Sequence, residues 1–223
     1  MKKITLNSAI LCTALLISVT ANANCDSDMQ DGQKYQYQVA KVSSHTHRLY
    51  FYEKNEGYDK SCPKSDEYCK TKKYVIAGDD VLISHTNGKW ACSWFSDKLG
   101  YWDWLNTNEL EFQDTHNTPV SAWIGHWTSD WSNINIIQHG NSFDVDGDST
   151  RIGSELPDGS HSESFGDISG TIKPLNNKAH LINDHDSDCS VDFTIVNKYL
   201  IVADNAQCGG MTVSFNGVYT KLK

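Results

Sequence analysis

The chain has 223 residues, of which 19 are Lys or Arg and 28 are Asp or Glu, so its formal net charge is −9. An acidic chain of this kind lacks the excess of positive charge that binding to a nucleic-acid backbone requires, and it would favour a basic partner. The length suits one large β domain or two small ones.

The first 23 residues have the layout of a secretory signal peptide. Lys2 and Lys3 precede an apolar run at 9–19, and small residues follow at 21–23. The apolar run is too short to span a bilayer, so we expect an export signal that is cleaved after Ala23. The mature protein is then periplasmic or secreted from a bacterium. Cleavage removes two of the 19 basic residues, which leaves 17 against 28 acidic ones and a net charge of −11.

The mature chain keeps six of the seven cysteines. An even number in an exported protein indicates disulfide bonds. Lipid modification of Cys25 is the alternative for that residue, but its neighbours Ala23 and Asn24 make a poor lipobox.

Residues 24–36 are polar and lack periodicity, so they form a lead-in segment. A first unit is expected at 37–112. Within it, two alternating apolar runs flank Asn87-Gly88, a dipeptide that type I′ hairpin turns prefer. A turn at that dipeptide would place Val81 opposite Trp94 and Ile83 opposite Cys92.

Further strands of this first unit are expected at 48–54, 73–79 and 100–105, with a polar turn at 106–110. Five short strands with hardly any helical periodicity indicate a small β-barrel.

A linker at 113–121, which contains Pro119, separates this unit from a second one at 122–223. The second unit has apolar-alternating runs broken by Gly, Asn and Asp, which indicates a barrel or sandwich of seven or eight strands. These runs are 134–138, 142–147, 166–172, 179–183, 190–196, 199–204 and 211–219. The chain is therefore predicted to be all-β, with two small barrels.

One hairpin of the second unit predicts a disulfide. A two-residue turn at Asn197-Lys198 places Ile195 opposite Leu200 and Cys189 two places from the position opposite Cys208. We therefore expect a Cys189–Cys208 bond. The other four cysteines allow three connectivities, of which we favour Cys62–Cys69 with Cys25–Cys92.

The segments "CPKSDEYCKTKKYVIAGDDVLI", "GKWACSWF" and "GYWDWL" resemble the SH3-like domains of exported bacterial proteins. The segments "WIGHW" and "DNAQCGGMTVSFNGVY" are similar to a C-terminal module that follows such domains in envelope proteins. The Gly125-His126-Trp127 pattern is also similar to the first strand of lipocalin-like barrels. These resemblances imply an exported, non-enzymatic protein and carry no catalytic residues or ligand class.

The stretch Asp144–Glu155 has carboxylates at the first, third, fifth and twelfth places, as in a calcium-binding EF-hand loop. However, Ser149 replaces the glycine of the sixth place, and Arg151 replaces the apolar eighth residue. Alternation of Phe143 and Val145 with aspartates instead favours a strand that enters a turn at Gly147, and we prefer this interpretation.

No spacing of His or Cys matches a zinc motif, so we expect no metal and no cofactor. Ser160 and His161 are adjacent but lack the context of a nucleophile elbow. Cys92 and His85 would suggest a cysteine peptidase, but an exported cysteine is better explained by a disulfide. The chain is therefore not expected to be an enzyme.

All seven tryptophans fall between positions 90 and 131. Most suit a core, whereas Trp90 beside a turn and Trp131 in a polar stretch suit an exposed recognition surface. Our candidate ligand-binding residues are Trp90, Asp97, Tyr101, Asp103 and Trp131.

The sequence thus predicts a non-catalytic periplasmic binding protein that recognises a cell-wall peptide or an envelope protein. The alternative is an inhibitor or immunity protein against a basic cell-wall hydrolase such as lysozyme, which the negative charge would attract.

Overall fold

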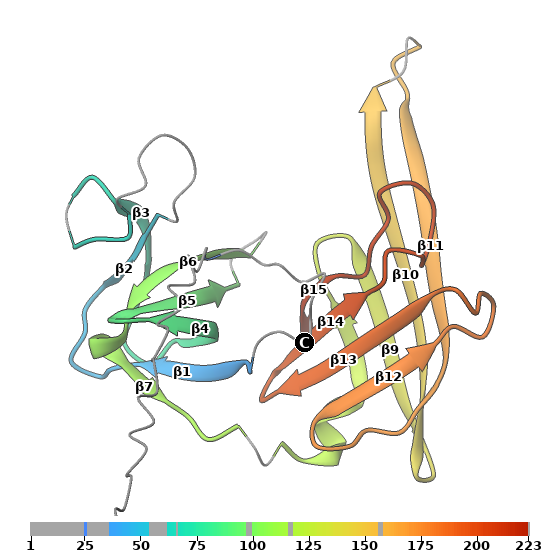
Figure 1. Ribbon diagram of the computed structural model, residues 1–223, viewed down its shortest axis with the longest axis horizontal. Coiled ribbons are helices and arrows are strands. Elements are labelled where there is room, and N and C mark those ends of the chain that lie inside the picture. The colour runs from blue at the N-terminus through green and yellow to red at the C-terminus, as the bar shows by residue number, and fades with distance from the viewer. Residues whose placement is uncertain are drawn as a thin grey trace, which may run out of the picture.

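The computed structural model describes residues 25, 36–53, 62–65, 67–96, 100–115, 118–155 and 158–222. The expected signal peptide, most of the lead-in segment and Asp97 lie outside these residues. The described chain forms two antiparallel sheets (Figure 1), so the all-β prediction is confirmed. None of its helices is long and apolar enough to cross a membrane.

The first sheet has seven strands in the order β3-β2-β6-β5-β4-β1-β7. Two of them, β1 and β7, have no counterpart among the five expected strands. A short 3-10 helix at Thr107–Glu109 occupies the expected polar turn and leads into β7. The strands are β1 Gln38–Val42, β2 Leu49–Tyr52, β3 Lys70–Val75, β4 Asp80–Asn87, β5 Trp90–Phe95, β6 Tyr101–Asn106 and β7 Leu110–Phe112.

The hairpin of β4 and β5 exists, but its expected register is wrong. Asn87 pairs with Trp90, so the turn lies at Gly88 and Lys89, and a bulge between Ile83 and His85 shifts the register again. Trp94 therefore faces Leu82 rather than Val81. The positive φ of Gly88, 58°, explains why glycine occupies this turn.

The second sheet has eight strands in the order β11-β10-β9-β8-β15-β14-β13-β12. Almost every strand pairs with its neighbour in sequence, and pairing of the last strand with β8 joins the two ends of the unit. The strands are β8 Gly125–Thr128, β9 Ser132–His139, β10 Ser142–Glu155, β11 His161–Ile172, β12 Lys178–Ile182, β13 Ser190–Val196, β14 Tyr199–Asp204 and β15 Gly217–Lys221.

A side chain bridges the remaining gap between β11 and β12 and leaves the barrel nearly closed. The amide of Asn183 donates to the carbonyl of Asp167 at 3.0 Å and accepts from the backbone N–H of Ser169 at 3.0 Å. The backbone N–H of Asp184 also donates to the carbonyl of Ser169. Asn183 is buried, and its side-chain amide satisfies backbone groups of β11 that a neighbouring strand would otherwise pair with.

The stretch that could have been a calcium loop is a continuous strand. The expected turn at Gly147 is wrong, because β10 runs through it to Glu155. Gly147 is needed for close packing, since a Cβ there would lie 2.9 Å from the carbonyl oxygen of Asn133. The carboxylates at 144, 146 and 148 alternate outward along the strand and do not converge on one point.

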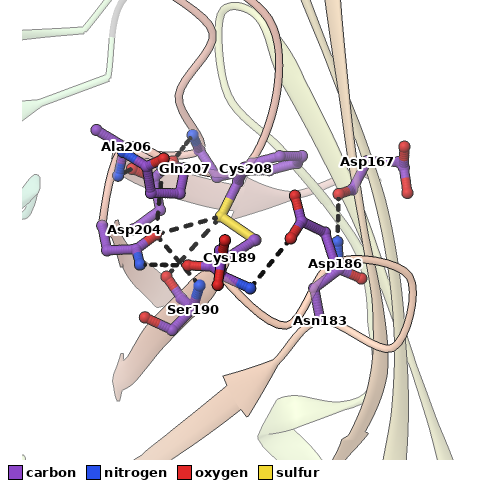
Figure 2. The surroundings of a disulfide bond; sticks show 12 residues. Asp167, Asn183, Asp186, Cys189, Ser190, Asp204, Ala206, Gln207 and Cys208 are labelled. Carbon is purple, nitrogen blue, oxygen red and sulfur yellow. Dashed lines mark hydrogen bonds between the residues drawn. A yellow bond between two sulfur atoms is a disulfide. The ribbon is translucent and has the colours of Figure 1, made fainter.

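The hairpin of β13 and β14 has the predicted register, with Ile195 opposite Leu200. The predicted Cys189–Cys208 disulfide is present at its open end (Figure 2). The favoured pairs Cys62–Cys69 and Cys25–Cys92 are confirmed as well.

The last expected strand, 211–219, is only partly correct because β15 begins at Gly217. A loop at 205–216 precedes it. The carboxylate of Asp204 holds both ends of this loop, since it accepts from the backbone N–H groups of Ala206 and Phe215. Positive φ values at Ala206 and Thr212 are incompatible with an extended strand there.

The two sheets share a hydrophobic core where they meet. Val39, Leu82 and Trp94 of the first sheet pack with residues of β13, β14 and β15. The rings of Trp94 and Tyr199 meet edge to face, with centroids 5.6 Å apart. A separate core fills the barrel and contains Trp123 and Trp127. The sheets are therefore packed against each other, and a cleft lies along their junction.

Candidate functional site: a cleft between the two sheets

The cleft has a volume of about 600 Å³ and is lined by both sheets. Clefts at such junctions are the usual place for ligand sites. The first sheet contributes Asp80 and Phe95, and the second contributes Lys198, Tyr199, Lys221 and Leu222. Its wall is thus partly apolar, with carboxylate and ammonium groups at defined positions.

The turn between β13 and β14 positions one side of this cleft. Asn197 has a φ of 57°, which lets the chain reverse in two residues. The reversal places the Nζ of Lys198 2.9 Å from the carboxylate of Asp80. Tyr199 follows and donates its hydroxyl to the carbonyl of Asp80 at 3.1 Å. The turn between β13 and β14 therefore positions two residues that contact the first sheet.

Two carboxylates line the cleft, Asp79 and Asp80. Asp79 accepts from the backbone N–H of Ile76 at 2.9 Å, whereas two lysines hold Asp80 in the ionised form. Its partial burial acts to raise its pKa, but the hydrogen bonds and charges of Lys198 and Lys41 outweigh burial and lower the pKa below the ordinary value. The Lys41 ammonium lies 3.5 Å from it. Asp80 is thus neutralised within the protein.

Lys221, at the end of β15, is the contrasting cation. Its Nζ lies 4.9 Å from the centroid of the Trp127 ring, and a Cβ on Gly125 would lie 3.4 Å from its side chain. Desolvation by burial lowers its pKa. No carboxylate of the described chain forms an ion pair with it. The cleft therefore offers a positive group that an anionic ligand can neutralise.

Tyr199 forms the inner wall beside these charges. Burial raises the pKa of its hydroxyl, and the charge of Asp80 adds to this effect. The phenol is therefore neutral throughout the physiological pH range, where it acts as a hydrogen-bond donor and as an apolar ring.

The expectation that Trp90 is exposed is wrong. Its side chain is only 7% exposed and packs with Trp104 and the Cys25–Cys92 disulfide. The ring of Tyr52 covers it at a centroid distance of 4.8 Å. Its place beside the turn suggested exposure, but the disulfide and the neighbouring aromatics enclose it.

Tyr101 and Asp103 both lie on β6 and share one partner. The Nζ of Lys73 is 3.6 Å from the centre of the Tyr101 ring and 3.9 Å from the carboxylate of Asp103. Asp103 is itself buried. These two candidates are thus neighbours whose charges and ring face already have contacts within the protein.

Trp131 is 45% exposed, as expected, but it lies in the second sheet's turn between β8 and β9. The guanidinium of Arg151 stacks over its ring at 5.0 Å. The candidates on β6 belong to the first sheet, so the structure does not bring the predicted residues into one site. The cleft residues Tyr199 and Lys221 gave no local signal of a site, because their role depends on how the sheets pack.

The residues considered for catalysis are engaged in other contacts. Ser160 donates its hydroxyl to Asp158, whereas the ring of His161 contacts the carbonyl of Gly153 at 3.3 Å. Cys92 is in a disulfide and is no thiol. Among the residues that the structure describes, no three His, Cys, Asp or Glu side chains gather where a metal could bind.

Comparison with models of known protein families, with characterised proteins and with solved structures finds no match for this chain. The resemblance to SH3-like and lipocalin-like modules therefore remains an expectation from the sequence.

Proposed function

We propose that this is a non-catalytic binding protein of the bacterial cell envelope and that the cleft between its sheets receives a cell-wall peptide. The proposal rests on one observation. The cleft holds a lysine, Lys221, without a carboxylate partner in the described chain, beside the apolar surfaces of Phe95 and Tyr199. Wall peptides combine free carboxylates with short aliphatic side chains, and this cleft complements both.

The rest of the cleft supports selectivity for such a ligand. Asp80 is paired with two lysines, so it repels an incoming carboxylate less than an unpaired carboxylate would. Asp79, the other carboxylate of the cleft lining, accepts from the backbone N–H of Ile76. The ring of Phe95, which is partly exposed in the cleft wall, contributes an apolar surface against which a methyl group packs. The packed junction holds both walls in place before a ligand arrives, which limits the entropy lost on binding.

The test is co-sedimentation of the oxidised mature protein with purified peptidoglycan sacculi, with and without added salt. We expect the protein to pellet. Lys221→Met, which keeps the length of the side chain and removes its charge, should weaken binding by about tenfold, as expected for loss of a charged hydrogen bond. Lys173→Met is the matched control, since Lys173 is an exposed lysine outside the cleft.

Three results would contradict the proposal. Absence of pelleting would exclude a wall ligand and leave an envelope protein as the partner. Equal loss in both lysine variants would indicate non-specific charge attraction. Unchanged binding by Lys221→Met would place the site outside the cleft.

A further inference from the structure

We propose that the projecting end of the β10–β11 hairpin is a docking surface for a cationic protein. This end, Thr150–Glu155 with His161–Phe165, is called the ribbon below. The proposal is independent of the cleft, which contains none of these residues. It gives a structural basis to the attraction of basic partners that the net charge of the sequence suggests.

The ribbon extends beyond the strands that support the rest of the hairpin. Pairing of β10 with β9 ends at Ser149 and Ser132, whereas pairing with β11 continues as far as Glu155 and His161. Figure 1 shows both strands projecting past their neighbours. A two-stranded ribbon has only marginal stability by itself. Its length therefore does not stabilise the isolated protein, and a binding role would explain it.

One face of the ribbon is partly covered by the protein itself. The backbone N–H of Gly210 donates to the carbonyl of Phe165, and a Cβ on Gly166 would lie 2.3 Å from the carbonyl oxygen of Cys208. On this same side, Arg151 stacks over Trp131. The opposite face, called the outer face, is the one that remains available.

The outer face carries two large apolar side chains that are mostly in solvent. Phe165 is 62% exposed and Ile152 is 56% exposed. Phe165 pairs with Thr150, and Ile152 pairs with Glu163, so the two apolar residues are diagonal neighbours on one face. Aromatic side chains such as Phe165 are enriched at protein interfaces relative to the rest of the surface.

The surroundings of this apolar pair are acidic. The outward positions of the hairpin carry Asp148 and Asp167 directly opposite each other, with Glu163 beside Ile152 and Asp144 and Asp146 farther along β10. The described outward positions at 144–152 and 163–171 include no Lys or Arg. Opposed like charges destabilise a strand pair. An apolar centre with an acidic border fits a partner with an apolar patch bordered by Lys and Arg.

The experiment measures binding of the oxidised mature protein to two small cationic proteins, lysozyme and cytochrome c, at low and at physiological salt. The acidic protein α-lactalbumin is the negative control. We expect at least one cationic probe to bind and its association to slow as salt is added. The double variant Ile152→Ser with Phe165→Ser should weaken binding by about tenfold or more. Asp148→Asn with Asp167→Asn should mainly slow association.

Matched controls separate the ribbon from the rest of the surface. Ile182→Ser removes an apolar residue that is 50% exposed on β12, and Asp188→Asn removes a carboxylate in the turn before β13. Neither should change binding. The proposal is overturned if neither cationic probe binds, if α-lactalbumin binds equally well, or if the ribbon variants bind like the wild type. The ribbon variants should sediment with sacculi like the wild type. A failure of the docking-surface proposal can therefore be distinguished from a failure of the proposed function of the cleft.

Discussion

The hydroxyl of Tyr199 donates to the backbone carbonyl of Asp80 across 119 positions of sequence. The bond joins β14 to β4, and the Tyr199 ring meets the ring of Trp94 edge to face. Together with the ion pair between Lys198 and Asp80, it fixes the relative position of the two sheets. The geometry of the cleft follows from this contact.

Tyr199→Phe should destabilise the protein by about 1 kcal/mol, because the ring is kept while the Asp80 carbonyl loses a hydrogen bond. Chemical unfolding followed by tryptophan fluorescence measures this difference. Tyr68→Phe is the control, since Tyr68 is largely exposed. Equal stability of the two variants would show that the hydroxyl makes no net contribution.

The ion pairs of Asp80 should make the free energy of unfolding depend on pH in the acidic range. Its pKa in the folded protein is lowered, so its contribution is present above the unfolded pKa of about 4 and is lost as the pH falls through the folded value. The destabilisation caused by Asp80→Asn should therefore be largest at neutral pH and should shrink towards pH 2. Urea unfolding across this range tests the trend, and an effect independent of pH would contradict it.

The three disulfides should differ in what they contribute. Their sequence separations are 67 for Cys25–Cys92, 19 for Cys189–Cys208 and 7 for Cys62–Cys69. From loop-closure entropy, replacing each pair by serine should lower the free energy of unfolding by about 4, 3 and 2.5 kcal/mol, in the same order. Denaturant unfolding of the three double variants should reproduce this order. The reverse order would show that local packing, and not chain entropy, controls the effect.

Gly166→Ala should disturb the loop at 205–216. The added methyl group would meet the backbone oxygen of Cys208 at 2.3 Å, and a backbone atom cannot rotate away. We expect a loss of about 1–3 kcal/mol, measured by thermal unfolding. Gly210→Ala is the comparison, because its nearest neighbour would lie at 3.4 Å. A wild-type melting temperature for Gly166→Ala would refute the steric argument.

The sequence predicted best what is local. The turn at Asn197-Lys198 set the register of its hairpin and thereby the Cys189–Cys208 disulfide, because strand alternation and turn length agree there. The register of the hairpin near Gly88 was wrong for two reasons. Its turn lies one residue later than the Asn87-Gly88 dipeptide indicates, and the bulge between Ile83 and His85 leaves no mark in the alternation. The strands β1 and β7 were missed because each is short and gains its stability from pairing with distant chain.

The cleft could not be predicted in the same way. Its walls come from strands whose packing is decided by side chains of both sheets, such as Leu82 and Ile201. The aromatic clustering that suggested a site at Trp90 was real, but it reflects packing around the Cys25–Cys92 disulfide. Composition identifies residues suited to binding, whereas tertiary packing decides which of them reach solvent.

The bridge made by Asn183 has a kinetic consequence. A ladder of many hydrogen bonds opens only when they break together, whereas this junction opens when the two hydrogen bonds of the Asn183 amide and the one from the backbone N–H of Asp184 break. Hydrogen exchange at the backbone N–H of Ser169 should then report one local event and not unfolding of the whole sheet. The barrel therefore has a site of local opening between β11 and β12, two strands that are neighbours in sequence.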